Sequence, residues 1–155
     1  MAGLMEEIFM STEAKRDYSP GLEGVIAGES AICWVDPNAG LLYCGYDVHE
    51  LAERSTFEEV AWLLLHGQLP NEMELSVFKR GLSETRELPG SVQTALRLLP
   101  RETRPIDLLR TGASMVAAFD PDLPSNAHEA NLRKAVRLIS KMATLAAAGW
   151  RLTRG

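Results

Sequence analysis

The stretch that sets the fold class is STFEEVAWLLLHGQLP, residues 55–70. Its start is typical of a helix N-terminus, because the Ser55 side chain can accept a hydrogen bond from an orphan N–H while Glu58 reaches back. Gly67 can adopt the left-handed conformation that ends a helix, and Pro70 cannot continue one. Between these signals, apolar residues recur at the spacing of one helix face: Phe57, Val60, Ala61 and Leu64. The stretch therefore predicts a core helix that ends before Gly67.

Similar helix signals recur downstream. Asn71 to Glu74 is a second capping-box start, and Pro105 suits the first turn of a later helix. We expect helices that end near Leu88 and at Pro100, a helix that starts at Pro105, and a long helix over about 125–149 or beyond. Each has an apolar face: Leu75, Phe78 and Leu82; Val92, Ala95, Leu96 and Leu99; Ile106, Leu109, Ala113 and Val116; Leu132, Val136, Ile139, Ala143 and Ala146.

The segment before these helices has the composition of β structure. Over residues 21–46, β-branched and aromatic residues fall between glycines, and residues 36–40 read DPNAG, a turn sequence. Residues 30–35 and 41–46 would be the arms of a hairpin, which is marginally stable unless it packs on something else. The sequence predicts a mainly α protein with a short N-terminal β-hairpin.

Composition limits the class of protein. The chain has 155 residues, 46% hydrophobic content and a formal net charge of −5, which fit one domain and argue against nucleic acid or an anionic membrane as a partner. Two cysteines suit a reducing compartment. No apolar run approaches the roughly 20 residues of a membrane span, and residues 1–20 lack a signal-peptide pattern. We expect a soluble cytoplasmic protein.

The last predicted helix ends unusually. Residues 142–150, MATLAAAGW, are apolar or small almost all round. A helix of this kind is normally buried on every side, and small residues allow close approach by neighbouring helices. We therefore expect additional protein around it, either more chain or a partner subunit.

Few residues indicate chemistry. None of His49, His66 and His128 pairs with another histidine at metal-ligand spacing, so we predict a helix-end role for His66 and surface positions for the other two. Four cations line one stripe of the last helix: Arg133, Lys134, Arg137 and Lys141. A solvated face is the favoured interpretation of this stripe, and an anion site such as one for a nucleotide phosphate is the alternative.

Four segments in order resemble the citrate synthase family, including the 2-methylcitrate synthases. Residues 21–32, GLEGVIAGESAI, are similar to its opening strand region, and residues 42–48, LYCGYDV, resemble its Tyr-Arg-Gly-Tyr-Asp-Ile element. Residues 55–70 match its next helix. Residues 104–111, RPIDLLRT, resemble its Pro-Met-Asp-Val-Leu-Arg-Thr signature, and residues 118–122 continue in register.

This resemblance implies a fold and an activity. The family is almost all α-helical, dimeric and built of a large and a small domain, and it condenses acetyl-CoA, or propionyl-CoA in the methylcitrate branch, with oxaloacetate. A base removes a proton from the thioester methyl group, a histidine stabilises the enolate, and water releases CoA after the carbon–carbon bond forms. The resemblance implies that acetyl-CoA is a substrate and that the reaction belongs to the tricarboxylic acid cycle. It also implies that no cofactor is bound permanently.

The resemblance covers an N-terminal portion of the family. It assigns residues 1–18 to an extension whose order the sequence leaves open, and residues 19–155 to the N-terminal part of a citrate synthase-like domain. The family's catalytic histidines and aspartate belong to later motifs such as His-Gly-x-Ala-Asn-Glu, so no catalytic, cofactor-binding or metal-binding residue is assigned in this chain. The family also carries an arginine, implicated in contacting CoA phosphates, where this chain has Cys44, and cysteine cannot supply a permanent charge.

Three hypotheses follow. The leading one is a citrate synthase-like acyltransferase subunit or fragment that is inactive alone and works with a downstream half or a homologous subunit. The second is a non-enzymatic paralogue that binds or regulates a full-length homologue. The third is a degenerate product that folds poorly. The replacement at Cys44 favours the last two hypotheses, and the intact capping and core patterns favour the first two.

Overall fold

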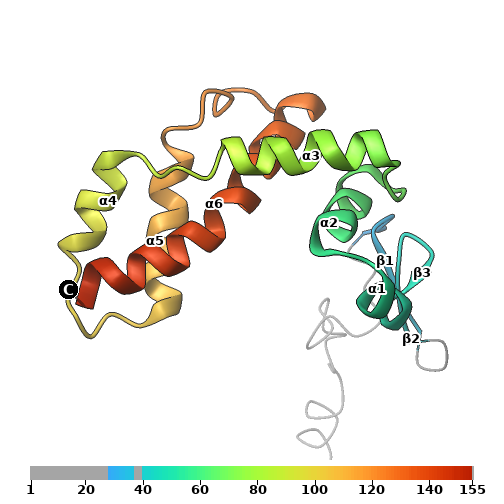
Figure 1. The fold of residues 1–155 in the computed structure, drawn as a ribbon, viewed down its shortest axis with the longest axis horizontal. Helices are drawn as coiled ribbons and strands as arrows, with labels where there is room; N and C mark the ends of the chain where they lie inside the picture. The colour runs from blue at the N-terminus through green and yellow to red at the C-terminus, as the bar shows by residue number, and fades with distance from the viewer. Residues whose placement is uncertain (1–27, 37–39, 155) are drawn as a thin grey trace, which may run out of the picture. The chain divides into compact units, whose positions relative to one another are not determined.

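Residues 28–36 and 40–154 are described by the computed structural model. The predicted extension over residues 1–18, the residues 21–27 and the predicted turn residues 37–39 lie outside the described part. From Ile32 onward the chain forms one compact unit, in which short strands precede a series of helices (Figure 1). The helices are α1 (Val48–Arg54), α2 (Phe57–His66), α3 (Glu72–Glu84), α4 (Gly90–Arg97), α5 (Pro105–Ala117) and α6 (His128–Arg154). The mainly helical fold class is confirmed.

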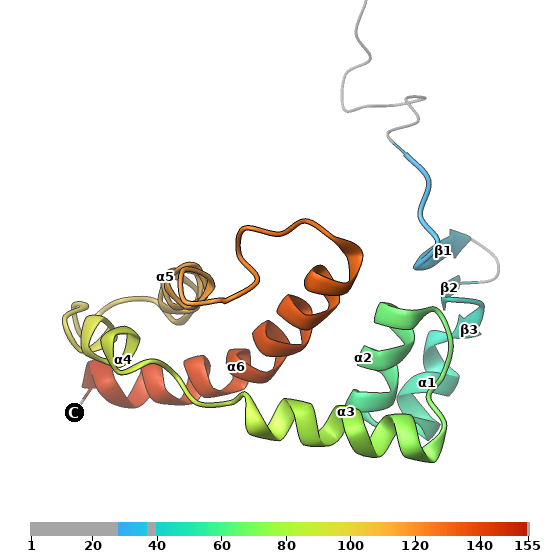
Figure 2. The same cartoon turned by 90° about the horizontal axis from the view of Figure 1, so that it is seen from above.

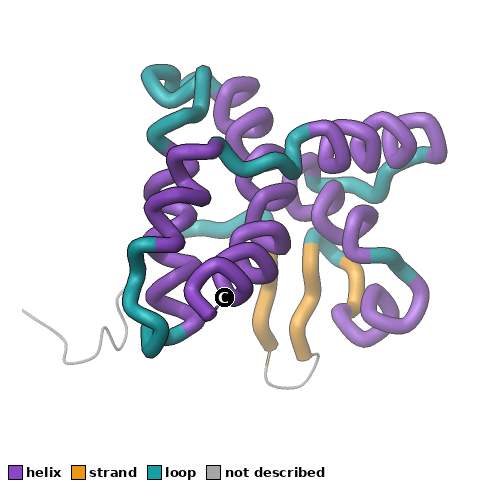
Figure 3. The backbone as a smooth tube through the Cα atoms, turned by 60° about the vertical axis from the view of Figure 1, so that its left-hand side comes forward, coloured by secondary structure: helices purple, strands orange, loops and turns teal. Residues whose placement is uncertain are grey.

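The strands form a small antiparallel sheet in the order β1-β2-β3 (Figure 3). They are β1 (Cys33–Asp36), β2 (Gly40–Tyr43) and β3 (Tyr46–Asp47). The predicted pairing of two arms is confirmed, but the second arm is not one strand. It turns at Cys44 and Gly45, whose φ angles are +48° and +90°, so that Tyr43 pairs with Tyr46. Positive φ at both central residues is the requirement of a type I′ hairpin turn.

The cap of α2 lies one residue later than the sequence predicted. Thr56 Oγ1 accepts from the Glu59 N–H at 3.4 Å, and Glu59 Oε2 accepts from the Thr56 N–H at 2.7 Å. The expected Ser55–Glu58 box is wrong because Ser55 ends α1 instead, with its N–H donating to the Leu51 carbonyl at 3.0 Å. The capping box predicted at the start of α3 is confirmed.

Helix ends agree less closely with the sequence than helix existence does. Helix α3 ends at Glu84 rather than near Leu88, α4 ends at Arg97 before reaching Pro100, and α6 begins at His128 rather than Ser125. In α6, Glu129 lies in the first turn and Arg151 and Arg154 in the last, which suits the helix dipole.

The predicted apolar faces are correct for α3 and α4, where Phe78, Leu82, Val92 and Leu96 are buried. They are wrong at two helix starts and along the end of α6. Phe57 of α2 is 69% exposed and Ile106 of α5 is 64% exposed. Ala143 and Ala146 of α6 are also exposed.

The core instead joins α5 and α6 through glycines. Gly112 of α5 lies against Leu145 of α6, and Gly149 of α6 lies against Leu108 of α5. A Cβ at position 112 would sit 2.7 Å from Leu145 Cδ2, and one at position 149 would sit 2.0 Å from Leu108 Cδ2. These reciprocal contacts determine which side of α6 is buried, and they turn Ala143 and Ala146 outward.

Helix α6 holds the helical part together. It packs against α3, α4 and α5 (Figure 2). One cluster of buried side chains joins α4, α5 and α6 with the segment before α4: Leu88, Val92, Leu96, Leu108, Val116 and Leu145. Each fully buried leucine contributes roughly 1.5–3 kcal/mol relative to exposure, so this cluster supplies far more stability than the caps.

Candidate functional site

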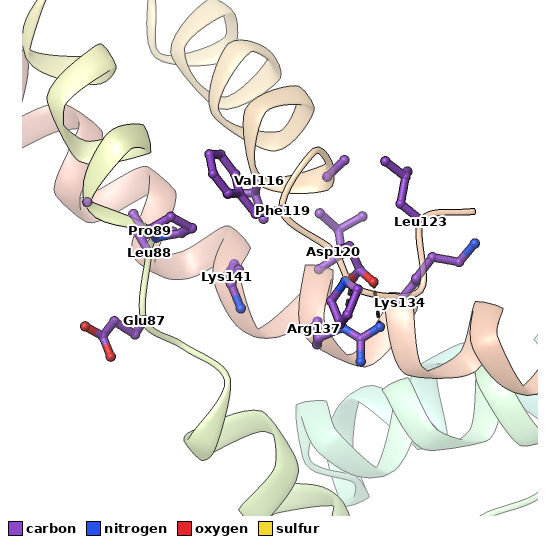
Figure 4. A pocket seen from close by; sticks show the side chains of 14 residues that line it. Glu87, Leu88, Pro89, Val116, Phe119, Asp120, Leu123, Lys134, Arg137 and Lys141 are labelled. Carbon is purple, nitrogen blue, oxygen red and sulfur yellow. Dashed lines mark hydrogen bonds and ion pairs between the residues drawn. The ribbon is translucent and has the colours of Figure 1, made fainter. Parts of the chain in front are cut away.

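A pocket of about 580 Å³ lies where α5 ends, alongside α6 and the segment between α3 and α4 (Figure 4). Its volume falls in the roughly 300–1,000 Å³ range of small-molecule sites. Its apolar wall consists of Leu88, Pro89, Val116, Phe119, Leu123 and Leu138. Its charged side chains are Glu87, Asp120, Lys134, Arg137 and Lys141. We refer to it as the α5–α6 pocket.

Arg137 is the central charged group of this pocket. Its Nε donates to Asp120 Oδ2 at 2.8 Å, and its Nη2 donates to Asp120 Oδ1 at 2.7 Å. The same Nη2 donates to Asp122 Oδ2 at 2.5 Å. Arg133 forms a second two-bond contact with Asp122, at 2.6 and 3.0 Å. The loop after α5 is therefore held onto α6 by two guanidinium groups.

These contacts shift the titration of both partners. Hydrogen bonds from Arg137 hold the pKa of Asp120 below its ordinary value. Hydrogen bonds from Arg133, then from Arg137, lower the pKa of Asp122 strongly. The pKa of Arg137 is raised mainly by its hydrogen bond to Asp120. All four groups are thus charged at neutral pH.

The two lysines of the predicted basic stripe differ from its arginines. Lys134 Nζ donates to the Ser125 carbonyl at 2.6 Å, and Lys141 Nζ donates to the Thr85 carbonyl. Burial lowers the pKa of Lys141, and the nearby charge of Arg137 adds to this effect. The favoured interpretation of the stripe as a solvated face holds only for Arg133, whose side chain is 55% exposed. Lys134, Arg137 and Lys141 are partly buried, and the stripe holds the loop after α5 and the end of α3 against α6.

Cys44 occupies the turn between β2 and β3. Its thiol donates to the carbonyl oxygens of Ile32 and Leu63, each at 3.6 Å. It is partly buried, between the start of the sheet and the end of α2. The position therefore presents a thiol directed at backbone carbonyls where the resemblance implies an arginine.

The three histidines stay apart in the fold. His49 lies in the first turn of α1, His66 ends α2 and His128 begins α6, and all three are exposed. The ring of His66 stacks on Trp62 with centroids 3.8 Å apart. These positions confirm the helix-end prediction for His66 and the surface predictions for His49 and His128, and none of the three lines the α5–α6 pocket.

Residues 28–36 and 40–154 contain no group of three or more His, Cys, Asp or Glu side chains arranged to hold a metal ion. Within the same residues, no helix is both long enough and apolar enough to cross a bilayer.

Sequence reasoning missed the ion pairs that shape the pocket. It identified Arg133 and Arg137 as part of a stripe, but it used residues 118–122, which include Asp120 and Asp122, for the family resemblance. Their sequence separations of 11, 15 and 17 residues are outside the local helix spacing at which pairing can be read directly. Alternating acids in a loop that precedes a basic helix are a usable signal for such a clamp.

The fold, mainly helical with a small antiparallel sheet, and the charged pocket beside a long helix define a class of helical domains rather than one chemistry. The family model described as "Citrate synthase, C-terminal domain" matches residues 21–155. The chain therefore belongs to the citrate synthase family.

Curated relatives and solved structures agree with this assignment. The Bacillus subtilis citrate/2-methylcitrate synthase is 40% identical over 141 residues, which are 90% of this chain and 38% of the relative. The Pyrobaculum aerophilum citrate synthase structure has a TM-score of 0.80 at 32% identity, covering 88% of this chain and 36% of that one. A Thermoplasma acidophilum citrate synthase, solved with carboxymethyl coenzyme A and oxaloacetate, has a TM-score of 0.80 at 27% identity and the same coverage. The chain thus spans less than two fifths of the length of these relatives.

Proposed function

We propose that this chain is a citrate synthase-like acyltransferase component that needs a complementary polypeptide. Together they would condense acetyl-CoA with oxaloacetate and release citrate and CoA. The observation that carries the proposal is the family match over residues 21–155, combined with the intact helical core. The binding of a CoA analogue and oxaloacetate by the Thermoplasma relative supports the substrate class.

The arrangement of the histidines supports the need for a second polypeptide. The reaction requires a base at the thioester methyl group and a donor at the developing enolate oxygen, both within hydrogen-bond reach. His49, His66 and His128 are separate surface residues on three different helices. The complementary polypeptide would therefore supply the catalytic histidines and aspartate.

Exposed apolar surface on α6 supports contact with another subunit. Ala143, Ala146 and Ala147 are exposed. A groove of about 470 Å³ runs between α6 and the α2–α3 pair, with Phe57, Leu82 and Ile139 among its lining residues. Small side chains let another helix approach α6 closely, and dimer formation of the family kind would use such surface. The free cysteines fit a cytoplasmic setting.

The test is reconstitution. The purified chain is mixed with the remaining part of the Bacillus subtilis relative, and CoA-thiol release from acetyl-CoA and oxaloacetate is followed. We expect release that requires both polypeptides. No release from a mixture that forms a stable complex would overturn the proposal, and propionyl-CoA in place of acetyl-CoA would reveal a methylcitrate preference.

A non-enzymatic paralogue is the second candidate, and Cys44 is the observation that favours it. A thiol directed at two carbonyl groups cannot contact a phosphate as a guanidinium does. Binding of the chain to intact Bacillus subtilis enzyme, with a change in that enzyme's rate and no activity in reconstitution, would favour this candidate. In the reconstituted enzyme, Cys44→Arg should instead lower the KM for acetyl-CoA several-fold while leaving the KM for oxaloacetate unchanged.

A further inference from the structure

Six arginines gather at one end of the helical part. They lie where α4 ends, where α5 begins and where α6 ends, three helix termini that are joined by the shared core cluster. All six side chains belong to exposed residues: Arg97, Arg101, Arg104, Arg110, Arg151 and Arg154. We call this surface the arginine end.

Few acids balance the arginine end. Residues 97–110 and 150–154 contain Glu102 and Asp107 as their acidic side chains. Asp107 is shared, because it accepts from Arg104 at 2.6 Å and also from Arg110. The contrast with Arg133 and Arg137 is clear, since those two arginines each meet aspartates that are largely shielded from solvent.

The excess of positive charge at the arginine end is opposite in sign to the net charge of the whole chain. Residues 1–90 contain 16 acidic and six basic side chains, whereas residues 91–155 contain five acidic and ten basic ones. Unbalanced like charges repel one another and destabilise the compact state. Their concentration at three adjoining helix termini therefore points to an anionic partner.

The chemistry of the arginine end narrows the choice of partner. Its cations are arginines throughout, while Lys134 and Lys141 belong to the α5–α6 pocket. A guanidinium presents a planar fork that matches a carboxylate through two hydrogen bonds, which an ammonium does not. Uniform use of arginine thus fits specific two-bond contacts with anionic groups such as carboxylates better than a diffuse attraction between opposite charges.

Large apolar side chains lie among these arginines. Leu98 is 82% exposed, Ile106 is 64% exposed and Trp150 is 49% exposed. The guanidinium carbon of Arg154 lies 3.6 Å from the centre of the Trp150 ring. Trp and Arg are the residues most often found as anchors in protein interfaces, so this surface offers both charged and apolar contacts.

We propose that the arginine end is a docking surface for an acidic protein segment that carries at least one large apolar side chain. The exposed apolar side chains Leu98, Ile106 and Trp150 favour a peptide over a nucleic acid. The surface is separate from the α5–α6 pocket, and the proposal stands whether or not the chain contributes to citrate formation.

The test uses a fluorescein-labelled 12-residue peptide that contains six glutamates and two leucines. Fluorescence anisotropy at low salt should give saturable binding to the wild-type chain, weakened at least tenfold by Arg101→Glu/Arg151→Glu. The matched control is Arg80→Glu/Arg86→Glu on and beyond α3, which changes net charge equally at two other exposed arginines. This control should bind as the wild type does, and circular dichroism should show that both variants are folded.

Two further measurements make the test decisive. A peptide with six glutamates and no leucine should bind several-fold more weakly, and Trp150→Ser should remove that difference. Equal loss of binding in both double variants would reduce the effect to overall charge and overturn the proposal. Tighter binding of phosphatidylglycerol vesicles or of duplex DNA than of the peptide would also overturn it, in favour of a lipid or nucleic-acid surface.

Discussion

Cys44 adopts a backbone conformation that side chains rarely tolerate. Its φ of +48° lies in the left-handed region, and Gly45 follows at +90°. For a non-glycine residue this conformation costs roughly 1–2 kcal/mol, and asparagine bears the cost best. The thiol contacts with Ile32 and Leu63 are long sulfur hydrogen bonds that offset little of it.

Substitution at this position should follow backbone preference. Cys44→Asn creates the Asn-Gly pair that type I′ turns favour, and we expect the free energy of unfolding to rise by about 0.5–1 kcal/mol. Cys44→Val places a β-branched side chain at positive φ and should lower it by about 1–2 kcal/mol. Urea unfolding in reducing buffer measures both. Equal destabilisation by the two substitutions would assign the effect to the lost thiol contacts instead.

Two glycines determine how closely α5 and α6 pack against each other. A Cβ at Gly149 would overlap the branched Cγ as well as the terminal methyl groups of Leu108, at 2.0–3.0 Å. A Cβ at Gly112 would meet mainly one methyl group of Leu145. The first overlap is the more severe, because more than the flexible end of the side chain must move.

We therefore expect Gly149→Ala to lower the free energy of unfolding by about 1–3 kcal/mol or more, and Gly112→Ala to lower it less. Gly81→Ala is the matched control in α3, where a new Cβ meets nothing within 4 Å, and it should stabilise the chain by about 0.5–1 kcal/mol. Thermal or urea unfolding followed by circular dichroism compares the three. A stabilising Gly149→Ala would contradict the close packing of α5 on α6.

The loop after α5 should respond to acid. The folded-state pKa of Asp120 is lowered mainly by its hydrogen bond to Arg137, and that of Asp122 is lowered by hydrogen bonds to Arg133 and then Arg137. Their stabilising effect is therefore complete above the unfolded value of about 3.9 and is lost as the pH falls through the folded values. We expect the free energy of unfolding to fall as the pH drops below about 5, and Asp120→Asn/Asp122→Asn to flatten that part of the curve.

A second carboxylate provides the control for this pH dependence. Asp107 pairs with Arg104 and Arg110, whose side chains are 75% and 74% exposed. Exposed pairs contribute little to stability, so Asp107→Asn should leave the acid limb of the curve nearly unchanged.

Arg137→Gln should lower the free energy of unfolding at neutral pH by about 1–3 kcal/mol, because Asp120 then keeps its charge without its partner.

At the scale of the whole molecule, the exposed apolar surface of α6 allows one substitution to test association without changing stability. Ala146 is exposed, so Ala146→Glu should change the free energy of unfolding of the chain alone by less than about 0.5 kcal/mol. Under the proposed function, the same substitution should abolish complex formation with the complementary polypeptide. Analytical ultracentrifugation of the mixture measures the second effect. Unchanged assembly would place the partner contact elsewhere.

Much of the fold could be predicted from the sequence because its signals are local. Helix existence follows from apolar spacing and from caps such as Asn71–Glu74, which need only four residues. The sequence predicts the capping box one residue early, at Ser55, because Ser55 and Thr56 are both good caps and only the end of α1 at Arg54 decides between them. The prediction of the buried face was wrong at the first turns of α2 and α5, where Phe57 and Ile106 are exposed.

The candidate site depended more heavily on tertiary structure. The sequence identified the cations of α6 and the aspartates of the preceding loop, yet their pairing depends on how the chain folds back over 15 to 17 residues. The α5–α6 pocket also needs Leu88 and Lys141, which come from segments far apart in the chain. No local sequence pattern predicts that these two segments come into contact.

The sequence by itself determined the helical class, the two-arm start of the sheet and the family, because periodicity, caps and signature segments are properties of neighbouring residues. Only the tertiary structure decided which side of α5 and α6 is buried, since that depends on Gly112 and Gly149 each receiving a leucine from the other helix. It also decided that the basic stripe is partly an internal clamp and that six other arginines remain exposed at one end. Charges and glycines acquire their roles from neighbours that are distant in sequence, and packing alone selects those neighbours.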